Sequence, residues 1–435
     1  MQHQSGFMLA VMMDWHYSPY LGLYGGLQRG HGTAAARLRD RPEHASLVYA
    51  CIGRDTRWDR QVDDRYTYLA RLLRDLRLDP APVVAQLRAC AAPPGPDDDD
   101  NRFELAAGVL TALAGTGDLQ AREALRDYIR DGTRWIETLE GLCDEWPVDW
   151  WDDLWETAAA RIDAEHAPQL WPHSQPWQRW YGRDRRLDTV LDAAGRDRPR
   201  ARTRRTDLAA ASDDELVGHL LAPGAGRGSI AAVLRHIRCR GHPVPQLLDV
   251  AERLALARPP GLLGALGAQG RLVVPLARAW ASDPDHPLFL DAPHLLAQHG
   301  DVQDIPVLLA ALDRLADRWC GHDTLTEGLA RILADAPDSA HAHTRARLVR
   351  QLRGLLIASP HSYERASHLR SLLLLDATRT TRVLPFFLLD CEPTVRLLAA
   401  QHTPLTDQSR YWIIQLRDDP IEDDEVRHTA AQRLA

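Results

Sequence analysis

The chain has 435 residues and a net charge of −8, and all 52 of its basic residues are arginine. No apolar run reaches the length of a membrane span, and the acidic balance disfavours general binding to nucleic acid. The six cysteines are scattered singly, which excludes a disulfide framework or a Cys-x-x-Cys zinc site. The first residues lack the basic region of a signal peptide, so we expect a cytoplasmic protein.

The first 134 residues are expected to be helical. Residues 1–90 are predicted to form N-terminal helical repeats, in which Thr33 is a candidate N-cap residue after a glycine-rich turn. Residues 91–101 are rich in proline and aspartate and are predicted to be a linker. Residues 102–134 are predicted to form a helix pair, with Asp118 capping the second helix.

Residues 135–205 depart from this pattern. Eight of the 13 tryptophans lie between Trp135 and Trp180, and an arginine-rich run from Arg183 to Arg205 follows them. Tryptophan and arginine are enriched in binding hot spots, which favours a recognition site. The predicted partner-binding residues are Trp146, Trp150, Trp151, Trp155, Trp171, Trp177, Trp180, Tyr181, Arg183, Arg185 and Arg186.

A plainer interpretation of this irregular segment stays open. Large aromatic side chains usually serve packing, so the tryptophans would fill a core and the arginine run would be a mobile loop. Replacing Trp151 or Trp177 with alanine separates the two interpretations. If these residues bind a partner, we expect capture of the partner to be lost while helicity stays intact.

Regular helices are predicted to resume in residues 206–435. Ser212 and Glu215 form a capping box, and strand-like alternation is nearly absent. Leucines at spacings of three and four indicate helical stretches at 231–258, 262–280, 288–299, 305–317, 324–335, 344–357 and 362–375.

Two short phrases recur along the chain. Residues 266–272 and 296–302 share a pattern of leucine and glycine 30 residues apart, with a third copy at 113–119. The phrase Val-Arg-x-x-Ala-Ala recurs 31 residues apart, at 395–400 and 426–431. Self-similarity at such a period is typical of stacked helix pairs.

The stretch Asp390-Cys-Glu-Pro-Thr-Val-Arg396-x-x-Ala-Ala400 resembles the HEAT-like repeat, in the compact form first named from phycobilin lyases. The resemblance covers residues 102–132 and 212–435. It implies that Val395 and the alanine pair pack between helices, as do Val426 and the alanines of the second copy. It also implies that Arg396 reaches an acidic or carbonyl group of a neighbouring repeat. The fold expected is all-α: a right-handed α-solenoid of stacked antiparallel helix pairs with a concave binding face.

No catalytic motif or metal-ligand spacing is present, so no cofactor and no metal are expected. We therefore predict a non-enzymatic scaffold or adaptor that binds a protein partner on its concave face and no membrane.

One alternative is a DNA-binding protein. Trp150-Trp151-Asp152 resembles HEAT-like alkylpurine DNA glycosylases, although Trp155 stands where the resemblance places the catalytic aspartate, and Asp153 is the nearest carboxylate on that face. The acidic balance disfavours nucleic acid as the partner. A further alternative is a modifying enzyme or lyase for a small aromatic ligand held between the tryptophans.

Overall fold

The computed structural model describes residues 17–57, 63–90, 101–197, 208–222, 224–315, 318 and 320–435. Within these ranges every regular element is a helix and no strand occurs, which confirms the all-α class. No helix among the described residues is long and apolar enough to cross a membrane. The predicted linker, apart from Asn101, and the predicted arginine run beyond Asp197 lie outside the described residues.

The chain divides into two compact units, which we describe separately. The described part of unit 1 lies within residues 201–359 and 364–380. That of unit 2 lies within residues 14–200, 360–363 and 381–435. The C-terminal array predicted for residues 206–435 thus contributes to both units.

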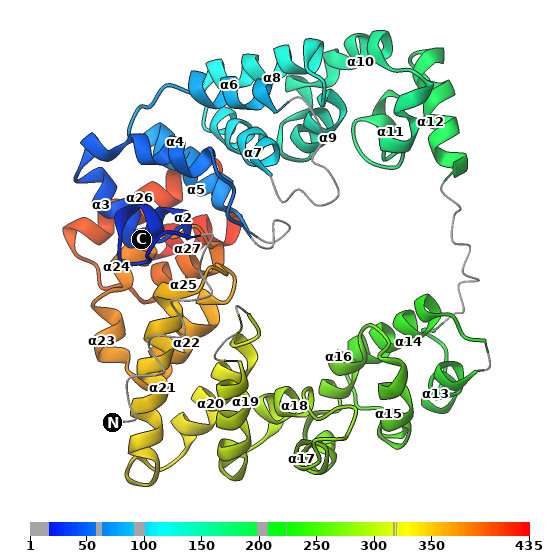
Figure 1. Ribbon diagram of the computed structural model, residues 1–435, viewed down its shortest axis with the longest axis vertical. Coiled ribbons are helices and arrows are strands. Elements are labelled where there is room, and N and C mark those ends of the chain that lie inside the picture. Colours follow the sequence, from blue (N-terminus) through cyan, green and yellow to red (C-terminus); the bar gives the residue numbers. More distant parts are fainter. Residues whose placement is uncertain are drawn as a thin grey trace. The chain divides into compact units, whose positions relative to one another are not determined.

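Unit 1 is a succession of helices in which next-but-one neighbours pack on each other: α14 on α16, α16 on α18, α18 on α20 and α20 on α22 (Figure 1). Its first helix begins after the predicted capping box, where Ser212 accepts from the backbone N–H of Glu215. The helices are α13 (Asp213–Leu221), α14 (Arg227–Cys239), α15 (Gln246–Ala257), α16 (Leu262–Gly267), α17 (Val274–Ser282), α18 (Ala292–His299), α19 (Ile305–Arg314), α20 (Asp323–Asp335), α21 (Asp338–Ala358) and α22 (Arg365–Leu375).

The repeated leucine and glycine phrase has the same structural role in its two copies in unit 1. At 266–272 it covers the end of α16 and the start of the 3₁₀ turn η5 (Gly270–Val273) that leads into α17. At 296–302 it covers the end of α18 and the start of η6 (Val302–Asp304), which leads into α19. The last residue of the phrase is exposed in both copies, Leu272 at 49% and Val302 at 47%. The recurring sequence therefore encodes a recurring turn between two helices.

Unit 2 combines the first and last helices of the chain. Its N-terminal part contains α2 (Leu23–Gln28), α3 (Gly32–Arg39), α4 (Ser46–Ile52), α5 (Arg65–Asp75), α6 (Ala81–Ala89), α7 (Arg102–Gly115), α8 (Leu119–Asp131), α9 (Trp135–Glu145), α10 (Trp155–Arg161), α11 (Trp177–Trp180) and α12 (Arg185–Asp197). Its C-terminal part contains α24 (Leu384–Phe387), α25 (Pro393–His402), α26 (Asp407–Asp418) and α27 (Asp424–Leu434), and α23 (Ala377–Thr381) ends at the border between the units.

Two predicted caps in unit 2 have different outcomes. Asp118 caps α8 as predicted, because its carboxylate accepts from the backbone N–H of Ala121 at 2.8 Å. The prediction for Thr33 is wrong, since α3 begins at Gly32 and its N-cap residue is His31. The chain also packs tightly at Gly32, where an added Cβ would lie 1.9 Å from the carbonyl oxygen of Phe386.

That close approach belongs to a junction between the two ends of the chain, where α3 packs on α24 and the blue helices in Figure 1 lie beside the orange and red ones. The backbone N–H of Cys391 donates to the carbonyl of Gly30 at 2.9 Å. Arg71 on α5 reaches Asp419, next to the end of α26, at 2.6 Å. Both contacts join residues more than 300 positions apart, so no local sequence pattern specifies them.

Arg396 behaves as the repeat resemblance implies. It donates to both carboxylate oxygens of Glu422 at 2.6 and 2.7 Å and to two backbone carbonyls before α25. Val395, Ala399 and Ala400 are buried, as expected. In the second copy Val426 and Ala430 are buried, but Ala431 is exposed because its copy lies in the last helix, α27.

Candidate functional site: an acidic cleft in unit 2

A cleft of about 640 Å³ opens in unit 2, where α5, α7 and the turn after α9 face α25 and the turn before α27. Its lining combines aromatic rings with an excess of carboxylates over guanidinium groups. The charged and aromatic residues that line it are Asp64, Tyr66, Glu145, Trp146, Trp150, Arg396, Glu422, Asp423, Asp424 and Arg427. Ligand sites in proteins are commonly concave, as this cleft is, although most of the residues that line it are polar or charged.

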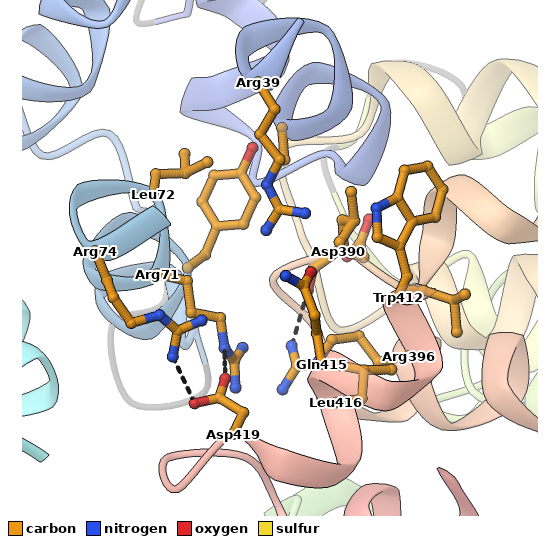
Figure 2. A pocket seen from close by; sticks show the side chains of 14 residues that line it. Arg39, Arg71, Leu72, Arg74, Asp390, Arg396, Trp412, Gln415, Leu416 and Asp419 are labelled. Carbon is orange, nitrogen blue, oxygen red and sulfur yellow. Dashed lines mark hydrogen bonds and ion pairs between the residues drawn. The ribbon is translucent and has the colours of Figure 1, made fainter. Parts of the chain in front are cut away.

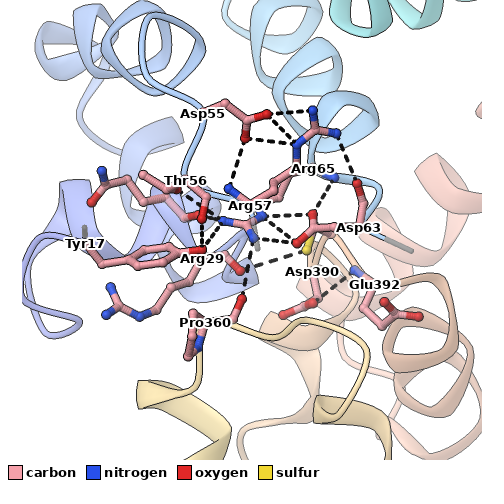
Figure 3. A network of polar contacts seen from close by, with 12 residues as sticks. Tyr17, Arg29, Asp55, Thr56, Arg57, Asp63, Arg65, Pro360, Asp390 and Glu392 are labelled. Carbon is pink, nitrogen blue, oxygen red and sulfur yellow. Dashed lines mark hydrogen bonds and ion pairs between the residues drawn. The ribbon is translucent and has the colours of Figure 1, made fainter. Parts of the chain in front are cut away.

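Asp64 is held at the start of α5 by the residues on either side of it. Arg65 donates to both carboxylate oxygens of Asp63 at 2.8 Å and to the Tyr17 hydroxyl at 3.0 Å. Figure 3 shows this network, which continues through a second pair, Arg57 and Asp55. Because these side chains are buried and fully engaged, the backbone that carries Asp64 has little freedom to move.

The aromatic wall is fixed from behind. The Trp146 indole N–H donates to the carbonyl of Thr111 on α7 at 3.1 Å. The rings of Trp146 and Trp150 meet edge to face, with centroids 5.6 Å apart. The guanidinium of Arg122 lies 5.2 Å from the centroid of the Trp150 ring, within the range of a cation–π contact. The wall of the cleft is therefore preformed.

Asp64 and Glu145 are the unusual carboxylates of the cleft. Burial raises the pKa of Asp64, while the neighbouring Arg396 opposes this rise. Glu145 is exposed at its surface, but the protein atoms around its carboxylate limit its solvation. This desolvation, and then the neighbouring Asp64 carboxylate, raise the pKa of Glu145 to about 7. Within the described ranges neither carboxylate forms an ion pair, whereas Arg396 is paired with Glu422 and Arg427 with Asp424. Glu145 is hydrogen-bonded to Tyr66 instead. The cleft thus presents five carboxylates against two guanidinium groups.

The structure brings only two of the predicted partner-binding residues, Trp146 and Trp150, to this cleft. Trp151, Trp177 and Trp180 are buried in the core, where their rings stack edge to face at centroid distances of 5.8 Å. A fully buried ring has no surface to offer a partner. Trp146 is itself only 5% exposed although it lines the cleft, so partner binding by these residues stays a prediction.

The remaining candidates lie away from the cleft. Trp155 is half-buried, and Trp171, Tyr181, Arg183, Arg185 and Arg186 are exposed. Trp171 and Tyr181 are the most accessible rings among them, at 62% and 56% exposure. None of these residues lines the cleft, so they carry a separate prediction from Trp146 and Trp150.

The two aspartates of the Trp-Trp-Asp motif are already engaged by arginines. Asp152 accepts from Arg179 at 2.9 Å and from Arg183 at 3.0 Å. Asp153 accepts from Arg126 at 2.6 and 3.0 Å. These ion pairs hold the pKa of both aspartates below the usual value, against the effect of burial. Neither aspartate lines the cleft.

Sequence reasoning missed the two cleft carboxylates that form no ion pair among the described residues, Asp64 and Glu145. Glu145 lies in an acidic stretch that is visible in the sequence, but Asp64 is 81 positions earlier in the chain and the other wall comes from residues beyond 390. No group of three or more histidine, cysteine or carboxylate side chains among the described residues has metal-binding geometry. Comparisons with protein-family models, curated proteins and solved structures find no match to this chain.

Proposed function

We propose that this protein is a cytoplasmic adaptor that binds a partner protein, and that the cleft in unit 2 holds a positively charged segment of that partner. One observation carries the proposal: an open cleft with an aromatic wall contains two carboxylates, Asp64 and Glu145, that form no ion pair among the described residues. A guanidinium or ammonium group placed between them supplies the missing charge and stacks on tryptophan.

The dimensions of the cleft suit such a guest. Ligand sites commonly occupy about 300–1,000 Å³, and the cleft of about 640 Å³ lies within this range. An arginine or lysine side chain with its flanking backbone fits this space, and its aliphatic stem packs against apolar lining groups such as Ile421. The two carboxylates then discriminate against neutral and acidic segments.

We also propose that the helices of each unit form a HEAT-like solenoid of the right-handed type. Two observations support this: helices of unit 1 pack on their next-but-one neighbours, and the repeated phrase recurs at the same helix-to-helix turn. Such arrays commonly bind partners on an inner face rather than catalyse reactions. A non-enzymatic scaffold is the role that this architecture supports best.

Filling the cleft is expected to abolish capture of the partner. Thr67 on α5 is half-buried and lines the cleft, so Thr67→Trp places a large ring where the guest has to enter. Affinity capture from the native host lysate, with nuclease, is compared for the wild type and Thr67→Trp. The exposed rings are tested with the double variant Trp171→Ala and Tyr181→Ala. This variant is expected to retain the partner.

This comparison separates the possible sites. Loss of the partner only with Trp171→Ala and Tyr181→Ala places the contact on those exposed rings and contradicts the assignment to the cleft. A partner that disappears on nuclease treatment contradicts protein binding and supports the DNA-binding alternative. Circular dichroism of each variant shows whether the helices are intact.

The raised pKa of Glu145 predicts a pH-dependent stability. Folding raises this pKa from 4.5 to about 7, so the folded state binds the proton more tightly than the unfolded state. The contribution of Glu145 to the free energy of unfolding therefore falls as the pH rises from about 4.5 to about 7, and it does not change above that. Glu145→Gln is neutral at every pH and removes this loss. Its unfolding temperature is expected to exceed that of the wild type at pH 8 but not at pH 4.5.

Glu156→Gln is the matched control, since Glu156 is an exposed glutamate of the same unit. Its difference from the wild type is expected to be small at both pH values. If the Glu145→Gln difference is the same at pH 4.5 and pH 8, Glu145 does not titrate near neutrality and the electrostatic description of the cleft is wrong.

A further inference from the structure

A second, much smaller pocket lies in unit 2 at the junction between the two ends of the chain. Its volume is about 30 Å³, and four arginines line it: Arg39 from α3, Arg71 and Arg74 from α5, and Arg396 from α25. Figure 2 shows these guanidinium groups around one space, with Gln415 of α26 on the opposite side. This pocket is distinct from the acidic cleft, with which it shares only Arg396.

Three carboxylates around the pocket are each shared by two of the four guanidinium groups. Asp419 accepts from both Arg71 and Arg74, and Glu422 pairs with both Arg71 and Arg396. In the same way Asp75 is shared by Arg39 and Arg74. Asp390, the other carboxylate of the lining, accepts the backbone N–H of Glu392 at 3.1 Å.

Two N–H groups at this pocket have no acceptor. Nη1 of Arg71 and Nε of Arg39 are buried and have no hydrogen-bond partner among the described residues. Arg71 is only 9% exposed, so bulk water does not compensate for the missing bond. Leaving a buried donor unsatisfied is unfavourable, and more so for a charged group. Burial, and then repulsion from Arg396, lower the pKa of Arg71, although Glu422 and Asp419 act in the opposite direction.

We propose that this pocket binds a small anion of about the size of chloride, held by the guanidinium groups of Arg39 and Arg71. A pocket needs roughly 10–15 Å³ to hold one water molecule, so about 30 Å³ admits a chloride ion but excludes a large organic anion. Because the pocket joins α3 and α5 to α25 and α26, an anion bound there stabilises the junction by mass action.

The test compares thermal unfolding of the full chain in sodium chloride and in sodium gluconate at equal ionic strength, since gluconate is too large for the pocket. The unfolding temperature is expected to rise with chloride and to saturate. Chloride-35 NMR of the folded protein is expected to show line broadening that bromide competes away. Equal unfolding temperatures in the two salts, without excess broadening, mean that only water occupies the pocket and overturn the proposal.

Three variants distinguish a bound anion from a general salt effect. Arg39→Gln is expected to lose both the chloride-dependent rise and the line broadening. Gln415→Glu brings a carboxylate into the pocket in place of the anion, so it is expected to unfold at a higher temperature in gluconate and to be insensitive to chloride. Arg417→Gln, an exposed arginine of the same helix that pairs with Asp418, is expected to keep the wild-type response. If Gln415→Glu keeps the chloride response, the pocket is not the site.

Discussion

Gly32→Ala is expected to destabilise unit 2 by roughly 3 kcal/mol or more, the upper part of the range for overpacking in a closed interior. An added Cβ would lie 1.9 Å from the carbonyl oxygen of Phe386 and 2.9 Å from the backbone nitrogen of Asp390. Both obstacles are backbone atoms, so the strain cannot be relieved by rotating a side chain. The whole of α3 has to withdraw from α24, and the junction between the two ends of the chain opens.

Denaturant unfolding followed by tryptophan fluorescence measures this effect, because eight of the 13 tryptophans lie between Trp135 and Trp180 and therefore report on unit 2. Gly141→Ala is the control. Gly141 lies in α9 of the same unit with no heavy atom within 4 Å of an added Cβ. It is expected to be neutral or to stabilise by about 0.4–1 kcal/mol. A mild effect of Gly32→Ala would mean that α3 and α24 are not in contact in solution.

Trp177→Ala is expected to cost about 3–5 kcal/mol, the usual loss for removing a large aromatic ring from a core. The Trp177 side chain is fully buried, and its ring packs edge to face against Trp135 at 6.3 Å and Trp180 at 5.8 Å. Its indole N–H also donates to Glu140, and this hydrogen bond would be lost. Fluorescence-detected denaturation again gives the free energy of unfolding.

The matched control is Trp171→Ala, since Trp171 is six residues away and 62% exposed. It is expected to change the free energy of unfolding by less than about 0.5 kcal/mol. The sequence alone led us to expect that Trp177→Ala would leave helicity intact and remove only partner capture. Because Trp177 is buried, we now expect its removal to destabilise the fold. Equal stability of the Trp177→Ala and Trp171→Ala variants would support the original expectation.

Local features of the fold were predictable from local sequence. The caps at Asp118 and Ser212 depend on residues three positions apart, and the turns after α16 and α18 depend on a seven-residue phrase. Arg396 was placed correctly because its repeat carries the residues that position it. The role of the tryptophan segment was harder to predict, because the sequence does not show whether a tryptophan fills a core or lines a cleft.

The junction and the cleft were not predictable in this way. Arg71 and Asp419 are 348 residues apart, and nothing in the sequence near either residue indicates the other. The acidic cleft depends on that junction, because its two walls come from α5 and from the turn before α27. Of the predicted partner-binding residues, only Trp146 and Trp150 line the cleft. Its carboxylates could not be singled out by sequence in a chain with 60 acidic residues.

The most direct test of the central claim is a binding titration with two peptides that differ only in one residue, arginine or its neutral isostere citrulline. At pH 8, the wild type is expected to bind the arginine peptide at least ten-fold more tightly. The variant Asp64→Asn with Glu145→Gln is expected to lose that preference. The control, Asp407→Asn with Glu156→Gln, removes two exposed carboxylates of the same unit outside the cleft and is expected to keep it. Equal affinity of the wild type for both peptides, or an undiminished preference in the cleft variant, would contradict the proposed role of the cleft.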